Sequence, residues 1–464
     1  METEVLICGA GACGLTLAIE LARRNVAFRL IEKQSEPFQG SRGKGIQPRS
    51  QEIFEDLGVL DRLVAAGGPY PPERIYKDDG SHVDNPLATG QATAAEPYHL
   101  TLMVPQFITE RILRDRLAEL GHRVEYGVEL LGFEQDEGGV TAELSDGSSR
   151  ARYLIGSDGG RSFVRPALKI GFPGETLGVR AVVADVRMTG ISNAWHRFNQ
   201  SHLEEMIMLC PLAGTDLIQI QGPVPSEGDV DVSAGGLTAL LQKRTGRPLV
   251  VDEVAWASVY SMNARLAERY KVGRVILAGD AAHIHPPTGG QGLNTSVQDA
   301  YNLGWKLAAV LGGAPEELLD TYEEERRPVA AGVLGLSIRL LDQMSKGPLR
   351  RSRETQQLDL GYPDSSLAGP RGGNRAPDAP LQGAGGQPIR LFQLLAGTHW
   401  TLVGYETDER CEARAGLRIY RIGGDLLDSQ GYFCEAYGVK SGEWVLVRPD
   451  GYIATVGELP EIES

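Results

Sequence analysis

The glycine pattern near the start of the chain places the strongest constraint on the fold. An apolar run of strand type, Val5 to Cys8, enters a loop that carries Gly9, Gly11 and Gly14 at Gly-x-Gly-x-x-Gly spacing. Leu15 to Arg24 then reads as a helix. Such glycines permit a tight turn, let a pyrophosphate approach the backbone, and let the helix pack closely on the strand. Because free N–H groups at a helix N-terminus bind phosphate, the stretch predicts a dinucleotide-binding βαβ unit.

An acidic residue supports this interpretation. A second strand, Ala27 to Ile31, ends at Glu32, which lies 18 residues after Gly14. A carboxylate at this place hydrogen-bonds the hydroxyls of an adenosine ribose and repels a 2'-phosphate, so the site should prefer FAD or NAD to NADP. A glycine-rich turn in another kind of βαβ unit is the alternative that the spacing alone leaves open.

Charge and cysteine usage exclude several classes of protein. The chain has 464 residues, enough for two or three domains, and a net charge of -15, which argues against nucleic acid or an anionic membrane as the main partner. Its five cysteines show no Cys-x-x-Cys or metal-finger spacing, so we expect a reducing, cytoplasmic setting and no metal site. Glu2 and Glu4 stand where a signal peptide would be basic, and no run approaches a membrane span.

Later segments return to the first pattern after an interruption. Residues 170–272 read as antiparallel strands with one helix, which predicts a separate sheet inserted into the nucleotide-binding unit. A buried strand, Val275 to Ala278, then ends in Gly279-Asp280 and leads through a glycine-rich loop into a helix. The basic residues Arg42 and Lys44 lie in an earlier glycine-containing loop, which either folds back over ligand phosphates or is simply solvated.

Three stretches together carry a resemblance to a known family. They are the glycine pattern with Glu32, then Gly156-Ser157-Asp158-Gly159-Gly160-Arg161-Ser162, and then residues 274–283, Arg-Val-Ile-Leu-Ala-Gly-Asp-Ala-Ala-His. In this order they resemble the single-component (group A) FAD-dependent aromatic hydroxylases of the para-hydroxybenzoate hydroxylase superfamily. Residues 42–50, 286–295, 374–378 and 447–452 resemble the branch of phenol-type, aromatic polyketide and rifampicin monooxygenases.

The predicted fold class is α/β with mixed α+β character, and the resemblance completes the domain plan. We expect a discontinuous, Rossmann-like FAD-binding domain (residues 1–170 and 273–345) with an inserted antiparallel-sheet substrate domain (171–272). A linker (346–389) should lead to a small thioredoxin-like C-terminal domain (390–464). This domain lacks Cys-x-x-Cys, so we expect a structural role or oligomer contacts, such as a homodimer, and no redox chemistry.

The resemblance also implies the residues that bind FAD. Gly9, Gly11, Gly14, Glu32 and Lys33 would hold the ADP half, and Arg42 and Gln106 would lie near the phosphates and the ribityl chain. Backbone N–H groups around Gly292, Leu293 and Asn294 would bind the flavin pyrimidine edge. Cys13 stands where many relatives have Pro or Thr. The implied cofactor residues are Gly9, Gly11, Cys13, Gly14, Glu32, Lys33, Arg42, Gln106, Leu130, Asp158, Asp280, Pro287, Gly292, Leu293 and Asn294.

The reaction implied by the resemblance is the hydroxylation of an electron-rich aromatic ring through a C4a-hydroperoxyflavin, with NADPH or NADH and O2 as co-substrates. The flavin carries this chemistry, so no catalytic side chain is named, and we expect His283 to hydrogen-bond structurally. The chain has one dinucleotide fingerprint, so no second Rossmann domain is left for the nicotinamide donor, and the resemblance implies a transient donor site on the protein surface near the flavin. Arg42, Lys44 and Arg161 are candidates for its anionic groups, with solvated charge as the alternative.

Strand alternation in the inserted sheet gives the candidates for contact with a small aromatic substrate. Ordinary core or solvent-facing positions are the alternative for each of them, namely Met206, Met208, Gln219, Gln221, Trp256 and Tyr260.

Two other functions compete with the hydroxylase. An NAD-dependent dehydrogenase would leave Asp158-Gly159 and Gly279-Asp280 unexplained. A flavoprotein that binds or sequesters an aromatic ligand without hydroxylating it remains the second alternative. A flavin-dependent halogenase is disfavoured, because the sequence has no Trp-x-Trp-x-Ile-Pro stretch.

Overall fold

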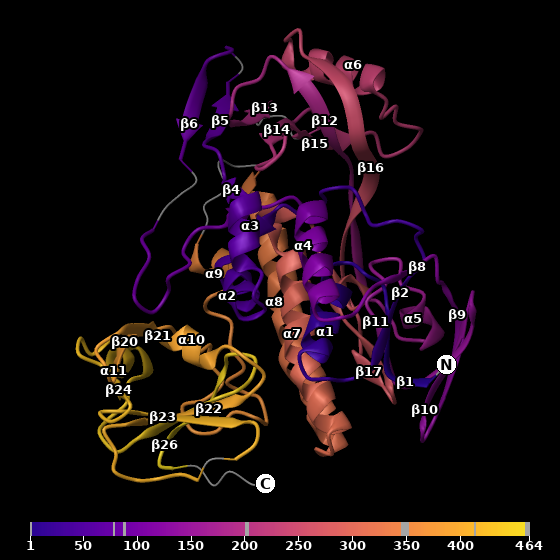
Figure 1. The fold of residues 1–464 in the computed structure, drawn as a ribbon. Helices are drawn as coiled ribbons and strands as arrows, with labels where there is room; N and C mark the ends of the chain where they lie inside the picture. The colour runs from indigo at the N-terminus through magenta and orange to yellow at the C-terminus, as the bar shows by residue number, and fades with distance from the viewer. Residues whose placement is uncertain are drawn as a thin grey trace.

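The computed structural model describes residues 2–77, 79–86, 90–199, 204–344, 352–412 and 414–459, and it confirms a mixed α/β fold (Figure 1). Two large sheets and a C-terminal sheet surround a central group of helices. No helix within the described ranges is long and apolar enough to cross a bilayer. The same ranges contain no group of three or more His, Cys, Asp or Glu side chains that could hold a metal ion.

The first sheet forms around β1, whose residues Val5, Leu6 and Ile7 are fully buried. β1 pairs in parallel with β2 and β11, and β18 extends the parallel sheet beyond β11. The continuous apolar runs suit strands covered on both faces. The strands are β1 Glu2–Cys8, β2 Phe28–Glu32, β8 Glu125–Tyr126, β9 Leu130–Asp136, β10 Gly139–Leu144, β11 Gly147–Gly156, β17 Lys271–Val272 and β18 Val275–Leu277.

Helices α1, α4 and α7 pack against one another beside this sheet, and α8 runs along α7 (Figure 1). Pro328 lies inside α8. The helices are α1 Ala12–Ala22, α2 Pro48–Asp56, α3 Leu60–Ala66, α4 Gln106–Glu119, α5 Val164–Ala167, α7 Gly292–Leu311, α8 Asp320–Met344 and α9 Arg353–Gln356, with 3-10 turns η1 Gly279–Ala281, η2 Thr288–Gly290 and η3 Glu316–Leu319. A small sheet joins β3 Gly45–Ile46, β4 Gly68–Pro69 and β7 Leu102–Met103.

The second sheet, here called the substrate sheet, has eight strands in the order β19-β16-β12-β15-β14-β13-β5-β6. Its apolar face, with Val182 and Ile220, packs under helix α6 (Ala234–Thr245), and its opposite face turns toward the first domain. The strands are β5 Glu73–Tyr76, β6 His82–Asn85, β12 Gly174–Thr189, β13 Trp195–Phe198, β14 Ile207–Pro211, β15 Ile218–Val224, β16 Val250–Leu266 and β19 His283–Ile284.

The C-terminal sheet has seven strands in the order β21-β20-β24-β23-β22-β25-β26. β22 pairs in parallel with β23 and antiparallel with β25, and Phe433 and Val445 are fully buried in its core. The elements are β20 Pro380–Gly383, β21 Pro388–Arg390, α10 Leu391–Leu395, β22 Trp400–Tyr405, β23 Leu417–Ile422, β24 Leu426–Leu427, α11 Tyr432–Tyr437, β25 Trp444–Val447 and β26 Ile453–Gly457.

The strand pairing differs from the predicted domain boundaries in three places. β5 and β6 join the substrate sheet although they precede residue 171, because Trp195 to Arg197 pair in parallel with Glu73 to Ile75. β19 joins the same sheet after residue 272. β20 and the first part of β21 belong to the C-terminal sheet and fall inside the predicted linker, whose residues 346–351 lie outside the described residues.

A buried interdomain ion cluster, formed by Lys306, Glu325, Arg448 and Asp450, joins the C-terminal sheet to α7 and α8. Lys306 Nζ lies 2.7 Å from Glu325 Oε2, and Arg448 lies 2.6 Å from Glu325 Oε1. Arg448 Nη2 also lies 2.5 Å from Asp450 Oδ2, and all four side chains are at most 1% exposed. Each charge therefore has an opposite charge in direct contact, which burial requires.

Replacing Arg448 by Met should lower the free energy of unfolding by about 3–5 kcal/mol, because Glu325 and Asp450 would lose their shared cation while still buried. Urea unfolding monitored by circular dichroism measures the change. The control is Arg421→Ala in the same domain: Arg421 lies 3.6 Å from Asp425 in a partly exposed ion pair, so its loss should cost less than about 1 kcal/mol. Equal losses in the two variants would contradict the cluster's importance.

Candidate active site

The three glycines of the first loop have different physical roles. A Cβ on Gly9, whose φ is 103°, would lie 2.4 Å from Ser157 O, and a Cβ on Gly14 would lie 2.0 Å from Gly9 O. These two positions therefore fit only glycine, because strand and helix approach each other there. A Cβ on Gly11 would meet only Glu110 Oε1, at 3.8 Å. The loop thus leaves open space at the N-terminus of α1, which fits a pyrophosphate.

The predicted ribose carboxylate lies beside this open space. Glu32 ends β2, and its Oε2 accepts a hydrogen bond from Ala10 N at 3.1 Å. Lys33 is exposed next to it, and Leu130 is buried in the apolar core where β9 begins. Burial raises the pKa of the Cys13 thiol well above its usual value, so Cys13 is a packing residue of the loop.

Two amides join the loop of residues 42–47 to the rest of the site. Gln106 Oε1 accepts from Gly43 N at 3.1 Å. Asn294 is fully buried: its Oδ1 accepts from Gln47 N at 2.8 Å, and its Nδ2 donates to Gly45 O at 2.8 Å. The Asn294 side chain is therefore committed to the protein, and only backbone groups at the start of α7 are available to a ligand.

The two aspartates of the family-like motifs have different surroundings. Asp158 Oδ2 caps α5, accepting from Phe163 N at 2.6 Å and Val164 N at 3.2 Å, while its Oδ1 is buried without a partner among the described residues. Asp280 is exposed, although desolvation raises the pKa of its side chain and His283 and Arg42 oppose the shift. Of the two aspartates, Asp280 is thus the one whose carboxylate is accessible to a ligand.

His283 has the structural environment that the sequence suggested. Its Nε2 lies 2.7 Å from Asp299 Oδ2, and Asp299 Oδ1 accepts from Arg326 Nε at 2.7 Å. His285 stacks on His283 with ring centroids 5.9 Å apart. Burial, reinforced by His283, lowers the pKa of His285 to about 3, so His285 is neutral at physiological pH.

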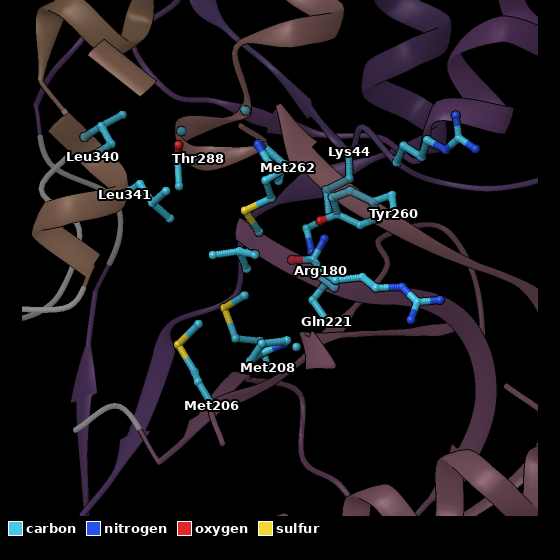
Figure 2. A pocket seen from close by; sticks show the side chains of 18 of the residues that line it. Lys44, Arg180, Met206, Met208, Gln221, Tyr260, Met262, Thr288, Leu340 and Leu341 are labelled. Atoms are coloured by element: carbon cyan, nitrogen blue, oxygen red, sulfur yellow. The ribbon is translucent and has the colours of Figure 1, made fainter. Parts of the chain in front are cut away.

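A cavity of about 640 Å³ lies between the substrate sheet and the first domain (Figure 2). Three methionines and two leucines give it an apolar wall, and the polar lining includes Tyr260, Gln221 and Lys44. The cavity wall is formed by the loop of residues 42–47, by β12, β14, β15 and β16, by the Pro287–Gly290 loop and by α8. The residues that line the cavity include Arg42, Lys44, Arg180, Met206, Met208, Gln221, Tyr260, Met262, Pro287, Leu340 and Leu341.

Four of the six predicted substrate residues line the cavity, and two do not. Met206, Met208, Gln221 and Tyr260 line it, and burial raises the pKa of Tyr260 to about 12, so its hydroxyl stays protonated. Gln219 and Trp256 do not line it.

Gln219 and Trp256 instead support the neighbouring loop. Gln219 Oε1 accepts from Lys44 Nζ at 2.7 Å, and its Nε2 donates to Ser41 Oγ at 2.8 Å. Trp256 makes an edge contact with Phe38, at a centroid distance of 5.3 Å. Both share the face of the sheet predicted from alternation, but they lie where the loop covers that face.

The cavity is also lined by several residues that were not among the predicted site residues. Met262 follows Tyr260 by two positions, so strand alternation could have identified it. Leu340 and Leu341 reach the cavity only because α8 packs across it, and Tyr70, Glu73 and Trp195 reach it through the unpredicted pairing of β5 with β13. Glu110 lies beside Gly11 only because α4 packs on α1.

Comparison with known proteins identifies the family. The family model described as FAD binding domain matches residues 2–337, and the one described as aromatic-ring hydroxylase, C-terminal, matches residues 369–463. The chain belongs to the FAD-dependent aromatic-ring hydroxylases. The predicted family and enzyme class, FAD-dependent aromatic monooxygenase, are thereby confirmed.

Individual relatives of the hydroxylase agree with this assignment. A flavin-dependent monooxygenase of Mycobacteroides abscessus is 42% identical, covering 98% of this chain and 97% of that protein. A rifampicin monooxygenase of Streptomyces venezuelae is 39% identical over 74% of this chain and 72% of its own. The solved complex of aklavinone-11 hydroxylase with FAD and aklavinone superposes with a TM-score of 0.85 at 28% identity, covering 99% and 96% of the two chains.

The geometry of the glycine loop predicts different effects for alanine at Gly11 and at Gly14 of the hydroxylase. Gly11→Ala should fold normally, because Gly11 has an ordinary φ of -73° and its Cβ enters open space, but FAD binding should weaken at least about tenfold because the methyl group occupies the pyrophosphate position. Gly14→Ala should destabilise the fold itself. Flavin fluorescence titration and thermal melting separate the two effects. Full FAD affinity in Gly11→Ala would show that the phosphates lie elsewhere.

Glu110 makes the stability of the FAD-free hydroxylase depend on pH. Desolvation raises the pKa of Glu110 from 4.5 to about 7, although its Oε1 accepts from Gln106 Nε2 at 2.8 Å. Between these pH values the folded protein holds a proton that the unfolded chain has released, so this contribution to stability is lost as pH rises toward 7. Glu110→Gln should therefore gain about 2 kcal/mol relative to wild type between pH 5 and pH 8.

Urea unfolding at the two pH values measures this gain. Glu119→Gln, on the same helix, is the control: Glu119 is at the surface, and its hydrogen bond with Arg62 lowers its pKa, so it does not titrate in this window. A constant difference between Glu110→Gln and wild type across the window would refute the shifted pKa.

Proposed function

We propose that this hydroxylase uses NADPH or NADH and O2 to hydroxylate an electron-rich aromatic compound in the 640 Å³ cavity. The observation that carries the proposal is the composition of the cavity wall. Pro287–Gly290, in the loop between Asp280 and α7, forms one side, and the substrate sheet forms the other. A ligand in the cavity therefore lies against the loop that leads to the expected flavin site.

The residues that would hold FAD agree with the open space in the structure. Gly9, Gly11 and Gly14 would hold the pyrophosphate, and Glu32 the adenosine ribose. The remaining contacts would come from Arg42 and Asp280, and from the backbone of Gly292 and Leu293 at the N-terminus of α7. Bound FAD would supply the redox chemistry, accepting electrons from the nicotinamide and activating oxygen.

The chain's own groups would orient the substrate and exclude water. Met206, Met208 and Met262 provide an adaptable apolar wall for an aromatic ring. Lys44 Nζ is held by Gln219 and lies 5.3 Å from the centre of the Trp195 ring, so a fixed positive charge is available to stabilise a phenolate. The Tyr260 hydroxyl and the Gln221 amide would donate hydrogen bonds to substrate oxygens.

The nicotinamide donor would bind at the surface near the same loop. The exposed Arg42 and Arg161 remain candidates for its phosphates. Lys44 is a weaker candidate than the sequence suggested, because it is half-buried, bonded to Gln219 and part of the substrate cavity.

A multi-ring phenol is the substrate class that the cavity and the relatives support best. The volume of about 640 Å³ is in the range of drug-sized ligand sites. One similar protein acts on aklavinone and another on rifampicin, by their names. A flavoprotein that binds an aromatic ligand without oxygenating it remains the competing function.

The deciding experiment incubates the FAD-loaded enzyme with phenols, naphthoquinones, tetracyclic polyketides and rifamycins. We expect one class to stimulate NADPH or NADH oxidation and to give a product heavier by one oxygen atom in mass spectrometry. Wild-type protein from which the FAD has been removed serves as the flavin-free control. Stimulated oxidation that yields only hydrogen peroxide with every class would favour the non-hydroxylating flavoprotein.

A further inference from the structure

The cavity wall is positively charged although the chain as a whole has a net charge of -15. Two carboxylates, Glu73 and Glu204, line the cavity, and Glu73 is already neutralised by the buried Arg197 at 2.6 Å. Four cations line it: Arg42, Lys44, Arg180 and Arg244. In an acidic protein, a local excess of positive charge marks a place where an anion binds.

Arg180 and Arg244 come from other elements than Arg42 and Lys44, the two cations of the 42–47 loop. Arg180 comes from β12 and Arg244 from the last turn of α6, and Figure 2 shows Arg180 near Gln221 and away from Thr288. Thr288 lies in the Pro287–Gly290 loop, on the side of the expected flavin. Arg180 therefore lies away from the loop on the flavin side, and the contacts of Arg244 with Met206 O and Pro223 O place it on the side of the substrate sheet.

Backbone carbonyls position both guanidinium groups. Arg244 donates to Met206 O at 3.2 Å and Pro223 O at 2.7 Å, and Arg180 donates through Nη1 to Pro225 O at 3.3 Å and Gly228 O at 2.6 Å. Pro223 and Pro225 are two positions apart, so their carbonyls lie about 7 Å apart if the chain stays extended. The two guanidinium groups are therefore held by neighbouring parts of one short stretch of chain, where both are available to acidic oxygens of one ligand.

Neither guanidinium has a carboxylate partner within the described part of the chain. Their carbonyl contacts leave Arg180 Nε and Nη2 and Arg244 Nε without a hydrogen bond to any described residue. Burial lowers the pKa of Arg244 and Glu205 only partly opposes the shift, as expected for a cation short of negative charge. A half-buried cation in this condition is stabilised by an incoming anion.

We propose that Arg180 and Arg244 form a subsite for an acidic substituent, a carboxylate or an equally acidic enol, carried by the aromatic substrate on the side away from the reacting ring. The inference rests on the proposed function for the identity of the cavity as the substrate site. It narrows the substrate class from aromatic compounds in general to aromatic acids.

The first test compares two probes of equal shape, anthraquinone-2-carboxylate and anthraquinone-2-carboxamide, on the FAD-loaded wild-type protein. Quenching of tryptophan fluorescence reports binding without turnover, since Trp195 lines the cavity. We expect the carboxylate to bind at least about tenfold more tightly than the carboxamide, and the ratio to shrink with added salt. Equal affinities, or tighter binding of the carboxamide, would overturn the inference.

The second test uses Arg180→Gln and Arg244→Gln. Each should weaken carboxylate binding by about tenfold and leave carboxamide binding unchanged, so that the ratio approaches one. Arg187→Gln is the matched control on the same strand, because Arg187 pairs with Asp216 and Glu253 outside the cavity. An equal loss for both probes would show a purely structural role for the arginines, with thermal melting of each variant as the check on folding.

The two hypotheses fail in different ways. Preferential, arginine-dependent binding of the carboxylate without any oxygenated product from any acid or neutral phenol would leave the subsite standing and refute the hydroxylase. Oxygenated products from neutral phenols, with no preference for acids in either binding or kcat/KM, would support the hydroxylase and refute the subsite.

Discussion

Helix α7 is the constraint on which the rest of the structure depends. Its first turn carries Asn294, whose side chain joins the 42–47 loop to the Pro287–Gly290 loop. One turn later Asp299 accepts hydrogen bonds from Gly279 N, 3.1 Å away, and from Arg326. Near its end Lys306 enters the interdomain ion cluster. The expected flavin end, the Gly-Asp turn and the C-terminal domain are therefore fixed to one rigid element.

Close packing brings α7 to the dinucleotide fingerprint. Gly304 of α7 lies so near α1 that a Cβ there would be 2.6 Å from Glu20 Cβ. Gly14 brings α1 equally close to the β1 loop. Both contacts need a missing side chain, so glycine sets the distance between the fingerprint and the start of α7. In a cofactor as long as FAD, that distance decides whether the two ends of the site fit one molecule.

Local patterns predicted the parts of this site that depend on neighbours in sequence. The Gly9 to Gly14 pattern and Glu32 belong to one strand–helix–strand unit, and the structure has that unit. Strand alternation correctly placed Gln219 and Gln221 on one face, but it could not show that Lys44 and Ser41 cover Gln219 while Gln221 reaches the cavity.

Residues that depend on the packing of distant elements gave no signal in the sequence. The β5–β13 pairing spans more than a hundred residues, and no local pattern links the two strands. Arg180 and Arg244 look like ordinary surface arginines until β12 and α6 bring them to the end of β15 and the residues that follow it. In such cases the position of a side chain depends on how distant elements pack, and neighbouring residues in the sequence do not determine it.

One loop connects the cofactor side of the molecule to the substrate side. Ser41 Oγ donates to Asp185 of the substrate sheet at 2.6 Å, whereas Gly45 is bonded to Asn294 of α7. Lys44 lies between them in the sequence, lines the cavity and donates a hydrogen bond to Gln219. The loop that borders the expected FAD phosphates is therefore also a wall of the substrate cavity. A movement of this loop would therefore alter the expected FAD site and the substrate cavity together.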